Sequence, residues 1–234
     1  MLYRERGVVL RTHKLGEADR IVSLMTEGRG KVRAVAKGVR KTHSKFGARL
    51  EPTSHVALQL HEGRNLDLVT QVERVETFSA LREDLDTLRR AVSMLEVVDQ
   101  VSQEGEPDAA LYRMLVGALR TLDETGNPVV VPAFFCKLLA HDGVRPVTDR
   151  CTECGTTLEL VAFDLVHGGV LCRTHRRGQP ISPEALALVV DVLGGRMNQA
   201  LAQPESAATI EFEGVATRSI EVHLERRLRS VGLY

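Results

Sequence analysis

The first eighty residues alternate apolar and polar side chains in short runs, a pattern typical of β-strands with one buried face. His55 to His61 shows the alternation in the letters HVALQLH, and turn signals such as Glu27-Gly28-Arg29-Gly30 separate the runs. The predicted strands cover residues 7–15, 20–26, 31–36, 55–61 and 66–75. Five short strands in this length predict a small closed barrel of the OB type, although an SH3-like barrel gives nearly the same pattern.

Beyond Thr77 the apolar residues recur at helical spacing. Ser182 before Pro183 is a favourable helix start, because serine caps free N–H groups and proline suits the first helical position. The predicted helices cover residues 81–99, 108–122, 128–143, a segment that begins at 182, and 215–231. The pattern therefore predicts a multidomain α+β protein, with an OB-fold β-barrel in residues 1–80 and an α-helical domain in residues 81–234.

Charge is distributed unevenly along the chain. The net charge is zero, with 31 basic and 31 acidic residues, which by itself argues against binding to nucleic acid. Local charge sets local potential, however, and from Gly28 to Leu50 eight residues are basic and none is acidic. The eight are Arg29, Lys31, Arg33, Lys37, Arg40, Lys41, Lys45 and Arg49. The stretch from Leu81 to Val130 leans acidic instead.

This basic segment suits contact with phosphates. In the strand from Lys31 to Lys37, basic residues alternate with small or apolar ones, so one face would be positive and the other would pack inward. The alternative is an ordinary solvated loop, although eight bases without an acid favour an anion-binding face. Phe46 would either stack on a base or pack into the barrel. With aromatics at 4% and no Trp, base stacking is not expected to dominate.

The N-terminus has no apolar segment behind a basic start, and no apolar run approaches the length of a membrane span. We therefore expect a cytoplasmic protein. Cysteines stay reduced in that compartment, so a close cysteine pair indicates metal ligands rather than a disulfide.

The strongest chemical signal is a set of two pairs, Cys151-Thr-Glu-Cys154 and Cys172-Arg-Thr-His175. Two residues between ligands allow a tight knuckle to direct both side chains at one tetrahedral ion, and Gly155 gives the backbone freedom after the first pair. The pattern C-x₂-C-x₁₇-C-x₂-H predicts one closed, structural Zn²⁺ site per chain, in a zinc-ribbon module of about residues 148–178.

Alternatives to this ligand set remain open. His167 lies nearby and competes with His175 as the fourth ligand, and the cysteines could be unconnected reduced thiols. Cys136 sits in the apolar run Phe134-Phe135-Cys136 and is expected in the core. A second basic cluster, Arg173, Arg176 and Arg177, either extends a DNA path or keeps the module soluble.

Motifs of catalysis are absent from the sequence. Gly28-Arg29-Gly30-Lys31 is not a P-loop, and no dinucleotide fingerprint, H-E-x-x-H or G-x-S-x-G occurs. We therefore expect no enzymatic activity. Two rival functions are a zinc-dependent hydrolase acting on DNA, which would need an open metal position, and an interaction scaffold, which would leave the basic segment unexplained.

Three segments resemble the RecO family of bacterial DNA repair and recombination mediators. The first joins GVVLR at 7–11, GEADRIV at 16–22 and GKVRAVAKGVR at 30–40; the second is FCKLLAHDG at 135–143, leading to Pro146; the third is CTECG at 151–155 with the later Cys172 pair. Many members of the family have cysteine at the last ligand position, where this chain has His175. Imidazole is also a good zinc ligand, so the site should survive this difference.

The resemblance implies a function as well as a fold. It implies binding to single- and double-stranded DNA, annealing of complementary strands, and work with RecR to load RecA on strands coated by the single-stranded DNA-binding protein SSB, in the RecF pathway. It also implies contact between the helical domain and the SSB C-terminal tail, for which Arg113 and Arg120 are candidate cations. We expect nucleoid association. The expected DNA contacts are Arg20, Lys31, Arg33, Lys37, Arg40, Lys41, Lys45 and Arg49.

Overall fold

The structure is a computed structural model and describes residues 1–41, 44 and 46–230. Among these, residues 1–126 form one compact unit and residues 127–230 form a second. The predicted domain boundary near residue 80 lies inside the first unit, between its barrel and its helices, and stays a prediction.

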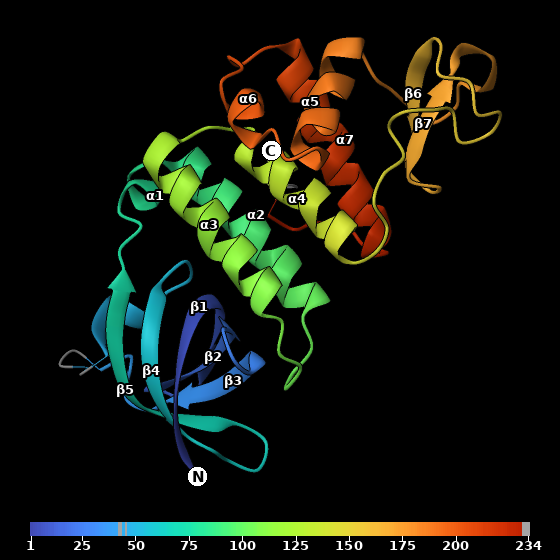
Figure 1. The fold of residues 1–234 in the computed structure, drawn as a ribbon. Helices are drawn as coiled ribbons and strands as arrows, with labels where there is room; N and C mark the ends of the chain where they lie inside the picture. The colour runs from blue at the N-terminus through green and yellow to red at the C-terminus, as the bar shows by residue number, and fades with distance from the viewer. Residues whose placement is uncertain (42–43, 45, 231–234) are drawn as a thin grey trace. The chain divides into compact units, whose positions relative to one another are not determined.

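A closed five-stranded barrel forms the N-terminal part of the first unit (Figure 1). Its strands are β1 (Leu2–Leu15), β2 (Asp19–Thr26), β3 (Gly30–Ala36), β4 (His55–His61) and β5 (Asp67–Glu76). The order around the ring is β1-β2-β3-β5-β4. A short parallel pairing of β3 with β5, at Ala34–Asp67 and Val35–Leu68, closes it, whereas the other pairings are antiparallel. The OB-type barrel predicted from the sequence is thus confirmed.

The alternation of side chains explains which face of each strand is buried. In β3 the residues Val32, Ala34 and Ala36 point into the barrel core, and they alternate with Lys31, Arg33 and Val35, which point outward. Phe46 precedes the short 3₁₀ helix η1 (Gly47–Leu50) and is buried in this core, so the packed alternative for its side chain is confirmed.

Strand β1 is long enough to serve two partners. Its first half pairs with β4, from Leu2 opposite His61 to Val8 opposite His55. Its second half pairs with β2, from Gly7 to Leu15, with a bulge between Val9 and Arg11. The bulge shifts the pairing with β2 by one residue and lets the strand bend around the barrel.

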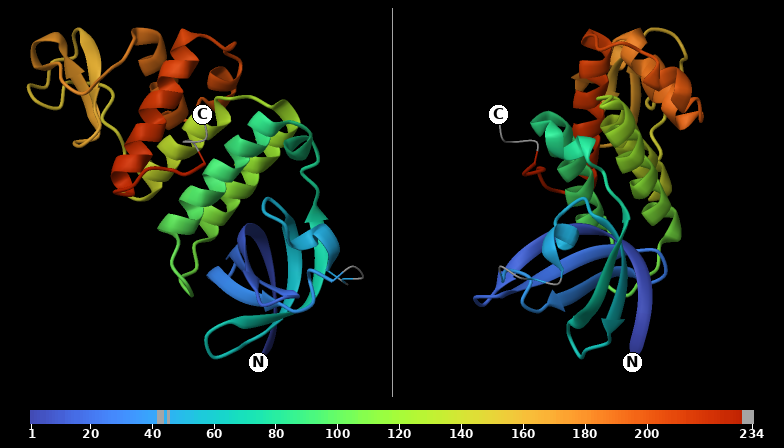
Figure 2. Two further views of the ribbon diagram at one scale, coloured as in Figure 1. Left: turned by 180° about the vertical axis from the view of Figure 1, so that it is seen from behind. Right: turned by 90° about the vertical axis from the view of Figure 1, so that its left-hand side faces the viewer.

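Three helices complete the first unit: α1 (Ala80–Glu83), α2 (Leu85–Val101) and α3 (Ala109–Thr125). The single helix predicted over 81–99 is interrupted at Asp84, because this residue is extended and its carboxylate caps the Thr87 N–H at the start of α2. Asp108 caps α3 in the same way. Figure 2 shows α2 and α3 side by side, with α2 packed on β1 and β2.

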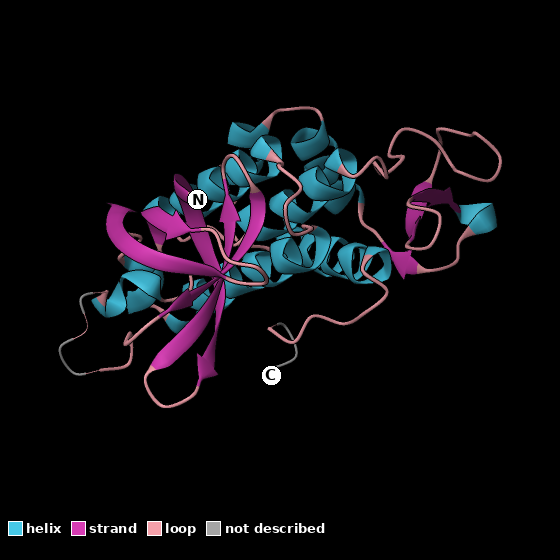
Figure 3. Cartoon of the chain, turned by 90° about the horizontal axis from the view of Figure 1, so that it is seen from below, coloured by secondary structure: helices cyan, strands magenta, loops and turns pink. Residues whose placement is uncertain are grey.

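The second unit combines helices with a small three-stranded sheet. The helices are α4 (Val130–His141), α5 (Pro183–Leu193), α6 (Met197–Leu201) and α7 (Ala207–His223), and the strands are β6 (Leu160–Asp164), β7 (Gly169–Cys172) and β8 (Gln179–Pro180). Figure 3 shows the strands set apart from the helices of this unit by extended loops. Ser182 caps α5 with Pro183 in the first turn, as predicted.

The last helix differs from the prediction of 215–231. It begins at Ala207, because Ser206 and Thr209 form a reciprocal capping box. It ends at His223, and Glu225 just beyond it has a left-handed backbone with φ of 52°. No helix in the described part of the chain has both the length and the apolar character needed to span a bilayer.

Candidate metal centre and nucleic-acid interface

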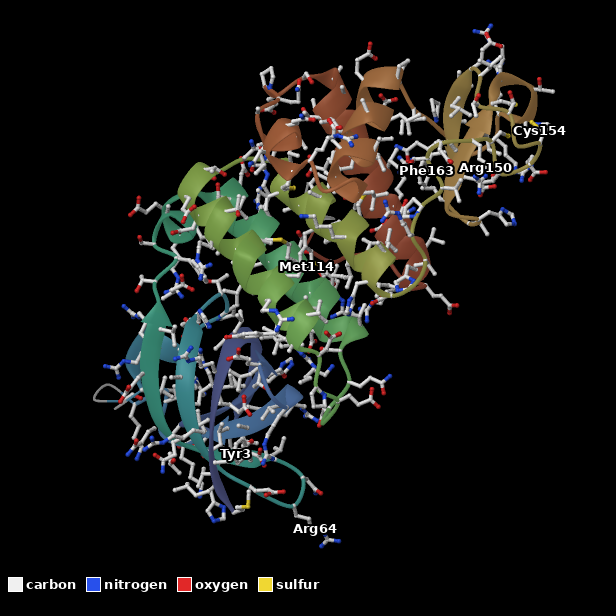
Figure 4. All side chains as sticks on the ribbon, in the orientation of Figure 1. Tyr3, Arg64, Met114, Arg150, Cys154 and Phe163 are labelled. Carbon is white, nitrogen blue, oxygen red and sulfur yellow. The ribbon has the colours of Figure 1, made fainter. Side chains whose placement is uncertain are left out.

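The sheet of the second unit presents the cysteine pairs at one end. β6 and β7 form an antiparallel hairpin with Leu160 opposite Cys172, and the 3₁₀ turn η2 (Arg173–His175) follows directly. The first pair lies on a knuckle that is tied to β7 by a hydrogen bond from the Thr152 N–H to the Val170 carbonyl. Figure 4 labels Cys154 on this outer loop. This hydrogen bond brings together two segments that are 18 positions apart in the chain.

Four side chains converge there: Cys151, Cys154, Cys172 and His175. Their ligand atoms all lie within 4.8 Å of one another. The Sγ atoms of Cys154 and Cys172 are 3.9 Å apart, and the Nδ1 atom of His175 lies 3.8 Å from the Sγ of Cys151 and 3.4 Å from that of Cys172. The group could hold a metal ion.

These distances fit a tetrahedral zinc ion. With Zn–S bonds of about 2.3 Å and Zn–N bonds of about 2.05 Å, tetrahedral angles separate two sulfurs by about 3.8 Å and a sulfur from a nitrogen by about 3.6 Å. The observed separations lie within a few tenths of an ångström of these values. Soft thiolates with one imidazole are also the donor set that zinc prefers in structural sites.

The backbone of the knuckle favours the thiolate form that a metal requires. Burial by itself would raise the pKa of the Cys151 thiol, but hydrogen bonds from the N–H groups of Cys172, Cys154 and Glu153 outweigh it and lower this pKa to about 6. The same balance, with the His175 N–H as the main donor, lowers the pKa of Cys172. Cys151 thus supplies anionic sulfur near neutral pH, whereas burial and the neighbouring Cys151 and Cys172 side chains raise the pKa of Cys154.

The two other candidates lie elsewhere. His167 is outside the four-residue group and instead hydrogen bonds through Nδ1 to Asp164 at 2.9 Å. Cys136 is buried in α4, and burial raises the pKa of its thiol to about 12, so it is a core residue as expected.

The outward residues of β3 do form a basic row, but acidic residues of the same unit pair with part of it. The Lys31 ammonium donates to the Asp99 carbonyl at 2.7 Å and lies 3.7 Å from that residue's carboxylate, with its side chain only 14% exposed. Arg33 pairs with Glu104 at 3.3 Å, and Arg20 pairs with Glu51 at 2.7 Å. The Lys31 ammonium is therefore held against Asp99 of α2.

The loop after β3 carries the more accessible cations. Lys37, Arg40, Lys41 and Arg49 are exposed. Arg40 donates to the carbonyls of Gly16 and Glu17 in the β1–β2 turn, which fixes this loop beside that turn. The eighth predicted contact, Lys45, lies outside the described residues.

The basic cluster of the zinc module is largely paired with acidic residues. Arg173 pairs with Glu159 at 3.4 Å. Arg177 contacts Glu153 and also Asp164, the latter at 3.3 Å. Arg176 is exposed. These ion pairs connect η2 and Arg177 to the rest of the module, which favours a structural role for Arg173 and Arg177.

A buried polar cluster joins the barrel to α3. His55 hydrogen bonds through Nδ1 to Glu76 at 2.8 Å and through Nε2 to the Tyr112 hydroxyl at 2.7 Å. Arg120 donates to the other Glu76 oxygen at 2.9 Å. Arg120 is thus paired within the first unit although half of its side chain is exposed, and Arg113 is exposed as well.

Sequence reasoning missed the acidic partners of the basic face. Asp99 is buried between Arg11, at 2.6 Å, and Lys31, while Glu104 belongs to the connection between α2 and α3. The only local signal for Asp99 was a charged residue on the apolar side of a helix, because its partners lie more than sixty residues away in the chain.

Comparison with known proteins identifies the family. Residues 1–78 match the family model described as "Recombination protein O N terminal", and residues 82–231 match "Recombination protein O C terminal". The chain is 44% identical over 241 aligned positions to a protein of Nocardioides sp. strain JS614 named "DNA repair protein RecO", covering 99% of this chain and 98% of that protein. The first model covers the OB-type barrel, and the second covers the helical region with its Cys₃His group. The chain therefore belongs to the RecO family of DNA repair proteins.

Proposed function

We propose that this chain is a non-catalytic mediator of DNA strand pairing. It binds single- and double-stranded DNA, anneals complementary strands and, with RecR, helps to load RecA on SSB-coated single strands in RecF-pathway recombinational repair. Its helical region receives the acidic, apolar C-terminal tail of SSB. A protein with these partners works in the cytoplasm, in association with the nucleoid. Membership of the RecO family supports each of these roles.

The observation that carries the proposal is the row of cations that leaves β3 and continues into the next loop. Exposed Lys37, Arg40 and Lys41 follow the outward residues of β3 without an intervening acid. Cations arranged in this way neutralise phosphates and release counterions, so DNA affinity would fall with rising salt. Neutralising two strands at once would lower their mutual repulsion and allow pairing. Arg20, Lys31, Arg33, Lys45 and Arg49 complete the proposed DNA contacts.

The Cys₃His group serves this function as a structural zinc site. Zinc bound by Cys151, Cys154, Cys172 and His175 would cross-link the knuckle to η2 and so add to the folding free energy of the module. Four protein ligands leave no tetrahedral position for a substrate water, which favours this role over a hydrolase.

The test is annealing of two complementary SSB-coated oligonucleotides with the full chain and no nucleotide. We expect faster annealing, and we expect the triple variant Lys37→Glu, Arg40→Glu, Lys41→Glu to lose it. Direct binding to a fluorescent oligonucleotide should weaken by more than tenfold and show a salt slope reduced by about 2 to 3.

A matched control removes equal charge from the same barrel. Arg4, Arg64 and Arg74 are exposed and lie outside the proposed contact set, so their replacement by glutamate should reduce binding much less. Equal losses in the two triple variants would point to net charge alone. A folded protein that neither binds DNA nor accelerates annealing would contradict the proposed function and favour a scaffold.

A further inference from the structure

The connection between α2 and α3 lies along an edge of β3. Gly30 and Lys31 form bridges with Glu104, the Lys31 N–H donates to the Gln103 carbonyl at 3.3 Å, and the Gly105 N–H donates to the Lys31 carbonyl at 3.2 Å. This edge lies before the point where β3 meets β5 at Ala34, so the connection pairs with backbone that the barrel leaves unpaired. The contact is built into the fold of the first unit.

The backbone of this connection lies very close to that of β3. Gly30 has a φ of 64°, and a Cβ atom added to it would meet the Glu106 carbonyl oxygen at 1.8 Å. Only glycine permits this approach of the two backbones. The position of Glu104 beside β3 is therefore fixed by main-chain contacts and does not depend on its own side chain.

Glu104 meets a cation that the proposed function needs. Its carboxylate lies 3.3 Å from Arg33, and both side chains keep contact with solvent, at 50% and 37% exposure. An exposed pair of this kind is weak, so it can exchange partners. The neighbouring pair differs, since Asp99 is only 5% exposed and holds Lys31 through both its carboxylate and its carbonyl. Lys31 is fixed, whereas Arg33 is exchangeable.

We propose that Glu104 is an internal competitor of the DNA backbone, whose carboxylate occupies Arg33 until a phosphate displaces it. The inference rests on the proposed function, because it describes how the same basic face is regulated. A carboxylate is the shape and charge analogue of a phosphate for a guanidinium group. The contact lowers the affinity of the resting protein for DNA and so favours release of strands once they have paired.

The experiment measures binding of the full chain to a fluorescent single-stranded oligonucleotide across a salt series. Glu104→Gln keeps the size of the side chain and removes its charge. We expect Kd to fall by about two- to fivefold, which is the range of a weak exposed ion pair. We expect the salt slope to change little, because Arg33 contacts a phosphate in the bound state of both proteins.

Glu106→Gln is the matched control. Glu106 is an exposed acid of the same connection, and in the described part of the chain Arg33 pairs with Glu104 and not with Glu106, so neutralising Glu106 changes the net charge equally. We expect this variant to change Kd by clearly less than Glu104→Gln does. In an Arg33→Gln background, Glu104→Gln should have no larger effect than Glu106→Gln, since the shared partner is gone.

The outcomes separate this inference from the function on which it depends. If the parent protein binds DNA with a salt-dependent Kd but Glu104→Gln matches Glu106→Gln, the internal competitor is refuted and the proposed function stands. A Glu104→Gln effect that persists undiminished without Arg33 also refutes it. If neither the parent nor any variant binds DNA, the proposed function itself fails.

Discussion

At the scale of single residues, the charged groups of this chain divide into fixed and exchangeable ones. Lys31, Asp99 and Glu76 are half-buried or buried and hold elements together, whereas Lys37 and Lys41 have exposed side chains. The distinction decides which substitutions report on binding. Charge reversal at Lys31 would place a carboxylate beside Asp99, so it would test the fold before it tested DNA contact.

Glu76 shows how a fixed charge affects stability. The hydrogen bond from Arg120 lowers the pKa of Glu76 below its ordinary value of 4.5; burial opposes this shift, and the hydrogen bond with His55 adds to it. A folded-state pKa below the unfolded one stabilises the protein at pH values above 4.5. That contribution is lost as the pH falls through the lowered pKa.

We therefore predict that Glu76→Gln lowers the stability of the protein at pH 7 by about 1 to 3 kcal/mol, the range for a charge-assisted hydrogen bond. The urea midpoint should also depend less on pH below 4.5 than in the parent. Urea unfolding followed by circular dichroism at several pH values measures both. Glu73→Gln, at an exposed position of the same strand, is the control for the loss of one carboxylate and should destabilise the protein less. Parallel profiles for the parent and Glu76→Gln would contradict the assigned role.

At the scale of elements, the strands of the barrel were predictable because successive side chains of each strand point alternately into the core and into solvent. Val32, Ala34 and Ala36 alternate with Lys31 and Arg33, and no other local structure buries one set and exposes the other. The last helix was misplaced because its start depends on a capping box at Ser206 and its end on a left-handed residue, Glu225. Apolar spacing carries no information on either.

The candidate sites were predictable to different degrees for a similar reason. Metal ligands at short spacing, such as Cys151 and Cys154, can be recognised from the sequence alone. The pairing of Arg33 with Glu104 joins residues 71 positions apart and depends on where the α2–α3 connection settles. Such a contact needs the tertiary structure, so the sequence alone does not show that Arg33 is paired with an acid.

The α2–α3 connection itself can be tested at Gly30. We predict that Gly30→Ala destabilises the protein by clearly more than the ~1 to 2 kcal/mol of a left-handed alanine, because the new methyl group overlaps the Glu106 carbonyl. Thermal unfolding gives the comparison. Gly16→Ala is the control, since Gly16 has a similar φ of 57° and no atom of the described residues lies within 4 Å of the added carbon. Equal losses at the two positions would mean that the connection does not sit on β3.

At the scale of the whole molecule, the two compact units should respond separately to the loss of metal. Zinc would cross-link only elements of the second unit, from Cys151 to His175. The barrel has its own apolar core around residues such as Leu24 and Leu60 and needs no ligand to close.

We predict that the purified chain contains one zinc ion and that its removal by a chelator increases amide hydrogen exchange across residues 151–175, with little change in the barrel. His175→Ala should lower the zinc content measured by mass spectrometry, and His175→Cys should retain it. His167→Ala is the control and should bind zinc normally, since His167 is paired with Asp164. Zinc loss in His167→Ala alone would reverse the assignment of the fourth ligand.

The double partnership of β1 has a consequence for synthesis of the chain. The half of β1 that pairs with β2 can form a hairpin as soon as β2 is synthesised. Leu2–Arg6 cannot pair until β4, which ends at His61, has been synthesised. At about 5 to 20 residues per second, the 46 residues between Leu15 and His61 take roughly two to nine seconds to synthesise. During that interval the waiting strand is an open edge on the ribosome, able to pair with another nascent chain. Arg4, Glu5 and Arg6 place three successive charges on it, which disfavours association with other chains until β4 arrives.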